Sequence, residues 1–213
     1  VDEISDGRLI LGIGAGYHQH EYDAFGYPYT DRFQRFAEGI EILHGLLRNG
    51  HIDYQGKFHS ARDCELLPRG PRPQGPPILV GTMGYKTLRL MARFGDEWNA
   101  YYDDTGNSVK ALPALRAKVD EACNDVGRDP ATMRRSATVL VADPKADPWW
   151  ERLPTDREKI TISPLAGESE ELAEALRAYE PEGINHIQIC LEPTTSETIE
   201  SFSRVLESLK ADD

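Results

Sequence analysis

Long apolar segments are absent from this sequence of 213 residues. No run approaches the roughly 18–20 consecutive apolar residues that cross a membrane, and the first residues lack the basic and apolar segments of a secretory signal peptide. Basic residues are also in deficit, with 24 Lys and Arg against 36 Asp and Glu, for a net charge of −12. This balance disfavours nucleic acids and anionic membrane surfaces as partners. We therefore expect a cytoplasmic protein that binds neither.

Cysteine is scarce as well, since the chain has only Cys64, Cys123 and Cys190. An odd number of cysteines cannot pair completely within one chain, and no two of the three have the CxxC spacing of a metal or redox site. Three free thiols in a reducing compartment are therefore expected.

Short apolar runs alternate with helical patterns along the chain, and 39% of the residues are hydrophobic, which is enough for one domain over residues 1–213. The predicted strands are 8–13, 77–80, 97–100, 138–141 and 184–191, and the predicted helices lie near 33–47, 88–92, 109–119, 169–179 and 199–209. Alternation of strands and helices predicts an α/β fold with a parallel sheet. An open doubly wound sheet and part of an eight-stranded barrel both satisfy this pattern.

Two segments interrupt the alternation. Residues 50–77 are rich in Gly, Pro and Arg, and 52–59 predicts a small hairpin with Gln55-Gly56 at its turn. Residues 143–167 form a second insertion, which contains Trp149 and Trp150. Because loops after strands form the functional face of both architectures, we interpret this insertion as a lid or pocket wall, with a disordered surface loop as the alternative.

The segment Gly81-Thr82-Met83-Gly84 lies between a predicted strand and a predicted helix. The unpaired amides and positive dipole end of a helix N-terminus favour an anion, glycines allow its close approach, and Thr82 adds a hydroxyl donor. The spacing is not that of a nucleotide-triphosphate loop, so we expect a phosphate monoester here. The alternative is an ordinary turn without a ligand.

A second glycine segment, Gly12-Ile13-Gly14-Ala15-Gly16, follows the first predicted strand. It is not the dinucleotide fingerprint, because Tyr17 stands where the third glycine belongs and the region about 20 residues further on is helical. We expect these glycines to let the backbone pass close to a flat ligand. The alternative is a tight strand exit with nothing bound.

Residues 17–22 are dense in side chains that move protons or stack on rings. In a helix, His18 and Tyr22 would share a face, and His18 and Glu21 would meet. A histidine with a carboxylate partner suits general acid–base catalysis near neutral pH. The histidine spacing is not that of a zinc-binding helix, so no metal is expected; the alternative is a solvated loop.

Further along the chain, Arg32, Arg35 and Glu38 are predicted to form a surface or interface ion network, with a phosphate contact from Arg32 as the alternative. Asp31 is the predicted N-cap of this helix and Asn49-Gly50 its predicted end. Asn99 follows Trp98 at the end of a predicted strand, where barrel enzymes place polar pocket residues.

In several of these segments the sequence resembles the luciferase-like monooxygenase family, which includes bacterial luciferase, alkane and alkanesulfonate monooxygenases and deazaflavin-dependent oxidoreductases. The matching stretches are GRLILGIGAG at 7–16, EYDAFG at 21–26, Arg32-Phe33 with Glu38, PPILVG at 76–81, LRLMARFGDEWN at 88–99, PLAG at 164–167 and GINH at 183–186. Their order and spacing carry the resemblance over nearly the whole chain.

The resemblance implies a TIM-barrel-type (β/α)8 fold, of which this chain would hold strands four to eight with their helices. It implies FMN or the deazaflavin coenzyme F420 as the cofactor, and hydride transfer or oxygen activation on a small organic substrate. The cofactor phosphate would lie at Gly81, Thr82, Met83 and Gly84, and the ring and ribityl chain at Gly14, Ala15, Gly16, His18 and Tyr22. Some relatives carry an acid directly after the glycines, where Tyr17 stands here, so His18 or Glu21 would be the catalytic residue.

On this alignment residues 1–6 end the helix before strand four, and strands one to three are absent. A barrel without three strands has two unpaired sheet edges, so we expect a truncated or cleaved piece, or a homo-oligomer such as a dimer that exchanges strands. A phosphate-ligand binder without catalytic activity and a doubly wound sugar-phosphate or nucleotide enzyme are the alternative functions.

Overall fold

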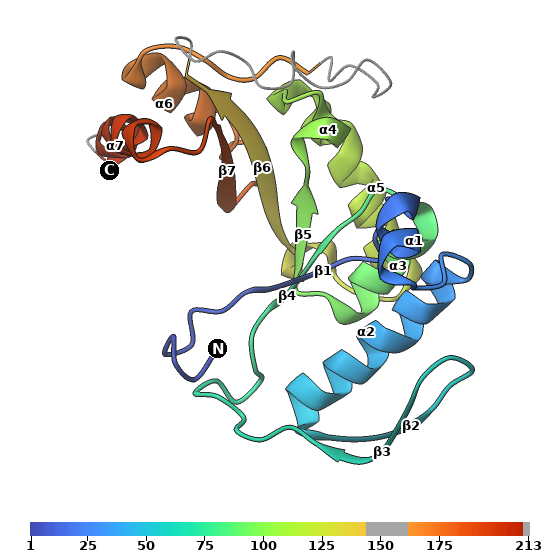
Figure 1. Cartoon of the computed structure of the whole chain (residues 1–213). Coiled ribbons are helices and arrows are strands. Elements are labelled where there is room, and N and C mark those ends of the chain that lie inside the picture. The colour runs from blue at the N-terminus through green and yellow to red at the C-terminus, as the bar shows by residue number, and fades with distance from the viewer. Residues whose placement is uncertain (144–161, 211–213) are drawn as a thin grey trace. The chain divides into compact units, whose positions relative to one another are not determined.

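The computed structural model describes residues 1–143 and 162–210. The chain forms two compact units, one of Val1–Trp98 with Val119–Met133 and the other of Asn99–Lys118 with Arg134–Asp213. The two units are described separately, and Figure 1 labels their helices and strands. The single domain predicted over residues 1–213 stays a prediction. Most of the predicted insertion at 143–167, with Trp149 and Trp150, lies outside the described residues.

The first unit contains two parallel strands with three helices and a separate hairpin. Strands β1 (Leu11–Ile13) and β4 (Ile78–Gly81) pair in parallel, and β4 adjoins β5 (Glu97–Ala100), which continues into the second unit. The helices are α1 (Gln19–Phe25), α2 (Arg32–Asn49) and α3 (Tyr85–Phe94). Strands β2 (His51–Gln55) and β3 (Ser60–Glu65) form the predicted antiparallel hairpin.

Helix α2 has the predicted bounds, but the expected side-chain cap at its N-terminus is not formed. Asp31 occupies the N-cap position in a left-handed conformation (φ 58°), and its side chain makes no capping hydrogen bond. At the other end, the backbone amide of Gly50 (φ 77°) donates a hydrogen bond to the Leu46 carbonyl. Glycine commonly ends helices in this way. Ile40 and Leu47 of the predicted apolar stripe are buried, whereas Leu43 is 37% exposed.

Glu38 joins helix α2 to the β2–β3 hairpin. Its carboxylate accepts the backbone amides of Lys57 (2.8 Å), Phe58 (2.9 Å) and His59 (2.8 Å). A carboxylate that accepts three amides fixes the loop in front of it, because each bond is charge-assisted. The hairpin therefore has a specific attachment to α2.

The second unit holds the end of β5 and two further strands. It contains β6 (Arg134–Ala142) and β7 (His186–Glu192), which pair in parallel from Ser136↔His186 to Ala142↔Glu192. Its helices are α4 (Tyr102–Thr105), α6 (Ser169–Arg177) and α7 (Ser196–Lys210), and α5 (Leu112–Asp125) begins in it after the 3-10 turn Val109–Ala111. A further 3-10 turn, Pro130–Thr132, belongs to the first unit.

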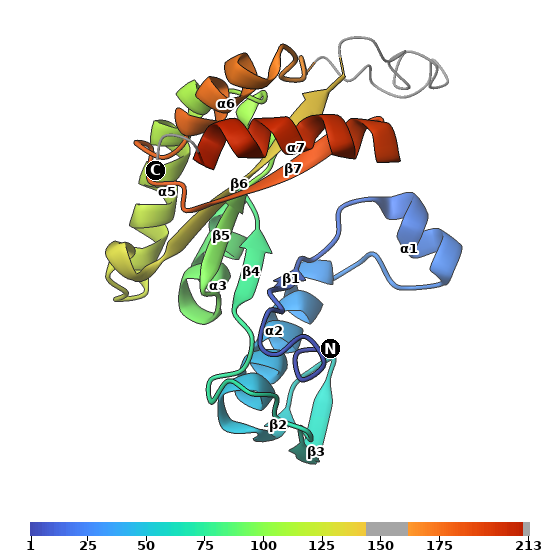
Figure 2. The ribbon, with the colours of Figure 1, turned by 90° about the vertical axis from the view of Figure 1, so that its left-hand side faces the viewer.

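The two faces of the β6–β7 pair differ in chemistry. Ile187 and Ile189 lie against α6 and α7, and both helices lie on one face of these strands (Figure 2). The cross-strand partners Thr138 and Gln188 are joined by a 3.2 Å hydrogen bond. Because successive side chains of a strand alternate between faces, this pair lies on the opposite face.

The described strands adjoin one another in sequence order within each unit: β1-β4-β5 in the first and β5-β6-β7 in the second. A doubly wound sheet requires a reversal of strand order, where its ligand binds. Neither described unit contains such a reversal, so the doubly wound alternative is wrong. Residues 1–6 also differ from expectation, because they form hydrogen-bonded turns rather than the end of a helix.

Candidate functional site

The two glycine segments predicted to bind one ligand begin at the same edge of the sheet. Ile13 of β1 is paired with Val80 of β4 in a parallel register, so Gly14 and Gly81 follow at the carboxyl ends of adjacent strands (Figure 1). Parallel α/β folds bind ligands at this edge because successive loops converge there. The register therefore places Gly14 and Gly81, where the two segments leave their strands, at the same edge of the sheet.

Helix α3 begins at this edge with an open N-terminus. Gly84 is its N-cap residue, with extended φ −73° and ψ 131°, and no side chain caps the helix or places an acid in its first turn. The first backbone bond of the helix runs from the Leu88 amide to the Gly84 carbonyl at 2.8 Å. The amides before Leu88 thus have no partner within the helix, which is the arrangement that binds anions.

The conformation of Gly84 does not require glycine. Its φ is accessible to any residue, and a Cβ atom would meet only the Thr87 Oγ1, at an ordinary 3.6 Å. A hydrogen bond from the Trp98 indole Nε1 to the Thr82 carbonyl, at 3.0 Å, stabilises the turn. The absent side chain therefore leaves space on the outer side of the turn, where a bound group would lie.

Gly14 and Gly16 differ in whether the backbone conformation and the surrounding space require a glycine. Gly16 has a left-handed φ of 70°, and a Cβ there would lie 3.0 Å from the Tyr22 hydroxyl oxygen, so the loop itself needs a glycine. At Gly14 a Cβ would meet nothing within 4 Å. Gly14 is thus the open position of this segment and Gly16 a structural one.

Tyr22 holds the 14–29 loop together. Its hydroxyl donates to the Ala15 carbonyl, and its ring packs edge-on against Tyr29 at 5.2 Å between centroids. Tyr29 in turn donates to the Tyr17 carbonyl at 3.2 Å and lies under the Arg32 guanidinium at 4.4 Å. The contacts of Tyr29 were not predictable from the sequence, because the partners of a loop tyrosine have no fixed spacing.

His18 directly precedes helix α1 and Glu21 lies in its first turn, and both residues are exposed. His18 is the N-cap residue of α1, just outside the helix, and its ring lies 5.7 Å from that of Tyr17 and 6.1 Å from that of His20. The Glu21 amide donates to the His18 carbonyl at 3.1 Å. Over the described ranges 1–143 and 162–210, no side-chain bond joins His18 to Glu21, so the expected pair is not formed.

The ion network expected at Arg32, Arg35 and Glu38 is replaced by other contacts. Arg32 stacks over Tyr29 and Arg35 over Phe58, at 4.4 and 4.5 Å from the ring centroids, while Glu38 binds the hairpin amides. Guanidinium groups stack well on aromatic faces, and the prediction did not consider that alternative. Beside α3, the Lys86 ammonium lies 6.0 Å from the Phe33 ring centroid, which places a cation near this N-terminus that the sequence analysis did not select.

Asn99 belongs to the second unit, where both polar groups of its side-chain amide form hydrogen bonds. Its amide nitrogen donates to Ser136 Oγ and its amide oxygen accepts from Thr138 Oγ1, both at 3.0 Å. Only 6% of Asn99 is exposed. In this structure the residue therefore links β5 to β6 rather than facing a pocket.

Three features considered in the sequence can be compared with the described part of the chain. The three cysteines there are free thiols, as predicted, and no group of His, Cys, Asp and Glu among those residues is arranged to hold a metal ion. Within the same ranges, no helix has both the length and the apolar character needed to span a bilayer.

A family model described as luciferase-like monooxygenase matches residues 1–188. The chain belongs to the luciferase-like monooxygenase family. The resemblance drawn from the sequence motifs is therefore confirmed.

Two relatives of this family member illustrate its range. It is 28% identical over 137 residues to pyrimidine monooxygenase RutA of Caulobacter sp. (strain K31), an alignment that covers 62% of this chain and 38% of the relative. It is 33% identical over 96 residues to 5,10-methylenetetrahydromethanopterin reductase of Archaeoglobus fulgidus, covering 45% of this chain and 28% of the relative. The alignments thus span well under two thirds of these relatives' lengths.

Solved structures support the same fold. An F420-dependent secondary alcohol dehydrogenase in complex with an F420-acetone adduct superposes with a TM-score of 0.76 at 18% identity, covering 98% of this chain and 72% of that one. The monooxygenase RslO1 from Streptomyces bottropensis gives 0.75 at 19% identity, covering 99% and 70%. At these identities the likeness establishes the α/β luciferase-like fold and no more.

Proposed function

We propose that this luciferase-like protein is a flavin- or deazaflavin-dependent oxidoreductase that acts on a small organic substrate by hydride transfer or oxygen activation. The observation that carries the proposal is the uncapped N-terminus of α3, opened by Gly84 at the sheet edge where Gly14 also leaves free space. Monooxygenases and F420-dependent enzymes among the relatives support the redox chemistry. The alignment implied by the resemblance makes the five parallel strands the fourth to eighth of a (β/α)8 barrel.

In this proposal the segment Gly81-Thr82-Met83-Gly84 binds the cofactor phosphate. The unpartnered amides at the start of α3 and the Thr82 hydroxyl donate to its oxygens, and the Lys86 ammonium adds a positive charge nearby. A residue without a side chain at position 84 keeps these donors accessible. FMN and coenzyme F420 both carry a phosphate group and a flat ring, so either fits this arrangement.

The ring of the cofactor would lie toward Gly14, Ala15 and Gly16, the loop that Tyr22 holds in shape. When bound, the group supplies a site for two-electron transfer, and reduced FMN can also activate oxygen. His18 is the residue we propose for proton transfer, with Glu21 as the nearby carboxylate. Both are exposed in this structure, as groups that must reach a substrate need to be.

The lack of a His18–Glu21 side-chain bond favours a second candidate, a phosphate-ligand binder without catalytic activity. A general acid or base is usually oriented by a partner, and here the histidine has ring neighbours only. The partners that we expect, a small-molecule substrate and a second copy of the chain, apply to the enzymatic proposal and stay predictions.

A titration followed by a turnover assay tests both candidates. FMN and F420 are added separately to the purified chain, and quenching of their fluorescence gives a dissociation constant for each. The enzyme proposal predicts saturable binding of one of them and oxidation of its reduced form that depends on a substrate or on oxygen. Binding without turnover supports the binder, and no binding of either cofactor contradicts both.

A further inference from the structure

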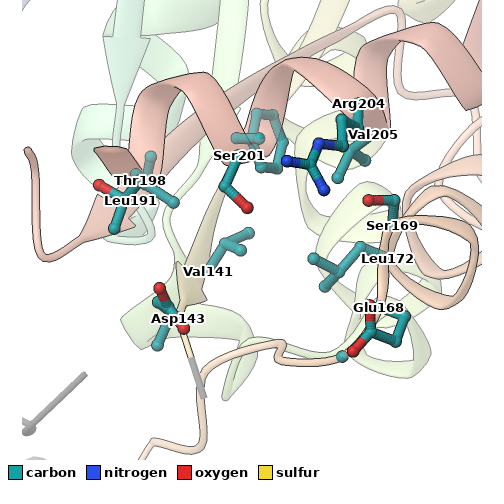
Figure 3. A pocket seen from close by; sticks show the side chains of 13 residues that line it. Val141, Asp143, Glu168, Ser169, Leu172, Leu191, Thr198, Ser201, Arg204 and Val205 are labelled. Atoms are coloured by element: carbon teal, nitrogen blue, oxygen red, sulfur yellow. The ribbon is translucent and has the colours of Figure 1, made fainter. Parts of the chain in front are cut away.

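A cavity of about 160 Å³ lies within the second unit at the carboxyl ends of β6 and β7 (Figure 3). Its floor is apolar and includes Val141 and Val205, each 1% exposed, and Leu172, which is 8% exposed. A volume of about 160 Å³ is below the ~300 Å³ of a typical drug-sized pocket, so the cavity suits a small ligand.

Polar side chains of helices α6 and α7 line one side of this cavity. Ser169 comes from α6, while Ser201 and Arg204 come from α7. Figure 3 shows the Arg204 guanidinium between the two serine hydroxyls, above the apolar floor. The cavity therefore combines an apolar base with a cation and two hydroxyls on one side.

Among the residues that the structure describes, Arg204 differs from Arg116 and Arg177 in having no protein partner. Arg116 pairs with Glu182 at 3.2 Å and Arg177 with Glu170 at 3.4 Å. For Arg204, no ion pair or hydrogen bond is formed with any residue that the structure describes. A guanidinium is planar and presents donors that match the two oxygens of a carboxylate.

We infer that this cavity binds a small organic monoanion, namely a carboxylate on a short apolar body. The carboxylate lies against Arg204, Ser169 and Ser201, and the apolar body lies on Val141, Leu172 and Val205. Glu168 and Asp143 also line the cavity, and their carboxyl groups disfavour a ligand with two negative charges. The site shares no residue with the proposed cofactor site and does not depend on it.

The inference is tested with 4-fluorobenzoate as the probe and 4-fluorobenzamide as its uncharged counterpart, each followed by fluorine NMR. The variants are Arg204→Gln and, as a matched control, Arg62→Gln, which alters another exposed arginine. We expect saturable binding of the benzoate to the unmodified chain and to Arg62→Gln, and at least about fivefold weaker binding to Arg204→Gln, because a charge-assisted contact is lost.

The inference would be overturned by the absence of saturable benzoate binding, by an equal affinity in Arg204→Gln, or by an affinity for the benzamide equal to that for the benzoate. Inorganic phosphate is added as a competitor at a pH where it is mainly a dianion. Displacement of the benzoate by an equal concentration of phosphate would contradict the assignment to monoanions, whereas weak displacement supports it.

Discussion

The Arg48 guanidinium and the Asp96 carboxylate lie 2.5 Å apart, and they join the end of α2 to the start of β5. The same carboxylate oxygen accepts the Ile78 amide at 2.7 Å, at the first residue of β4. Arg48 also donates to the Pro76 carbonyl at 3.2 Å. This pair therefore fixes the position from which β4 runs toward the proposed phosphate site.

Replacing Asp96 by alanine should destabilise the protein by about 2 kcal/mol, because the Arg48 guanidinium loses its carboxylate partner and the Ile78 amide loses its acceptor. The measurement is the urea midpoint of unfolding. Asp23→Ala is the control, since Asp23 is exposed on α1. A midpoint shift no larger than that of the control would show that the Arg48–Asp96 pair contributes little.

The Glu38 contacts predict a dependence of stability on pH. Desolvation of the carboxylate works toward a higher pKa, but the backbone hydrogen bonds from Phe58, His59 and Lys57 outweigh it and lower the pKa of Glu38 below its usual 4.5. A lowered folded pKa gives stability that is present above the unfolded pKa and is lost as the pH falls through the folded value. The stabilisation from Glu38 should therefore disappear on acidification below about pH 4.5.

The test compares the urea midpoints of the unmodified chain and Glu38→Gln at pH 7 and at successively lower pH. Glutamine keeps the shape but does not titrate in this range. We expect the unmodified chain to be more stable at pH 7 and its advantage to shrink as Glu38 protonates. A difference that stays constant down to pH 3 would mean that the carboxylate charge does not hold the hairpin.

The two glycines of the 14–16 segment should respond in opposite ways. Gly14→Leu places a side chain in open space, so thermal stability should hardly change while cofactor affinity falls at least about tenfold through steric exclusion. Gly16→Ala should lower stability by about 1–2 kcal/mol, because its φ of 70° is left-handed and its Cβ approaches Tyr22. Thermal melts and cofactor titrations on both variants separate the effects. Unchanged affinity in Gly14→Leu would place the ring elsewhere.

If His18 transfers a proton, its replacement should lower the turnover number while leaving the cofactor affinity nearly unchanged. His18→Ala should reduce the turnover number about a hundredfold, within the range usual for loss of a general acid or base, and change the cofactor dissociation constant less than twofold. His20→Ala is the matched control, as a neighbouring exposed histidine. Equal turnover in His18→Ala and His20→Ala would remove the catalytic role from His18.

The elements were predictable from the sequence because their periodicity and end signals are local. The apolar spacing from Phe33 to Leu47 and the glycine at position 50 gave both ends of α2. The cap geometry was not predictable in the same way, since Asp31 takes a left-handed conformation without a side-chain bond. Aspartate is compatible with both a capping and a left-handed conformation, so the residue type alone does not indicate which one forms.

The glycine segments of the candidate site were visible as motifs, whereas the side chains that support them were not. The roles of Tyr29 and Trp98 depend on contacts with Tyr17 and Thr82, which lie 12 and 16 residues away in sequence. Likewise, Glu38 was assigned to an ion network because charged neighbours on a helix suggest one. Its real partners are amides 19–21 residues away, which no helical spacing indicates.

The proposed phosphate site is tested most directly at Gly84 by comparing cofactor binding and stability in Gly84→Asp and Gly84→Ala. Alanine fits, with its Cβ 3.6 Å from Thr87 Oγ1, and aspartate at this extended N-cap position should keep or slightly raise the melting temperature. The account predicts that alanine retains most of the affinity for FMN or F420 while aspartate reduces it at least about a hundredfold, through repulsion of the phosphate. Aspartate and alanine variants that bind the cofactor equally well would contradict the assignment of its phosphate to the start of α3.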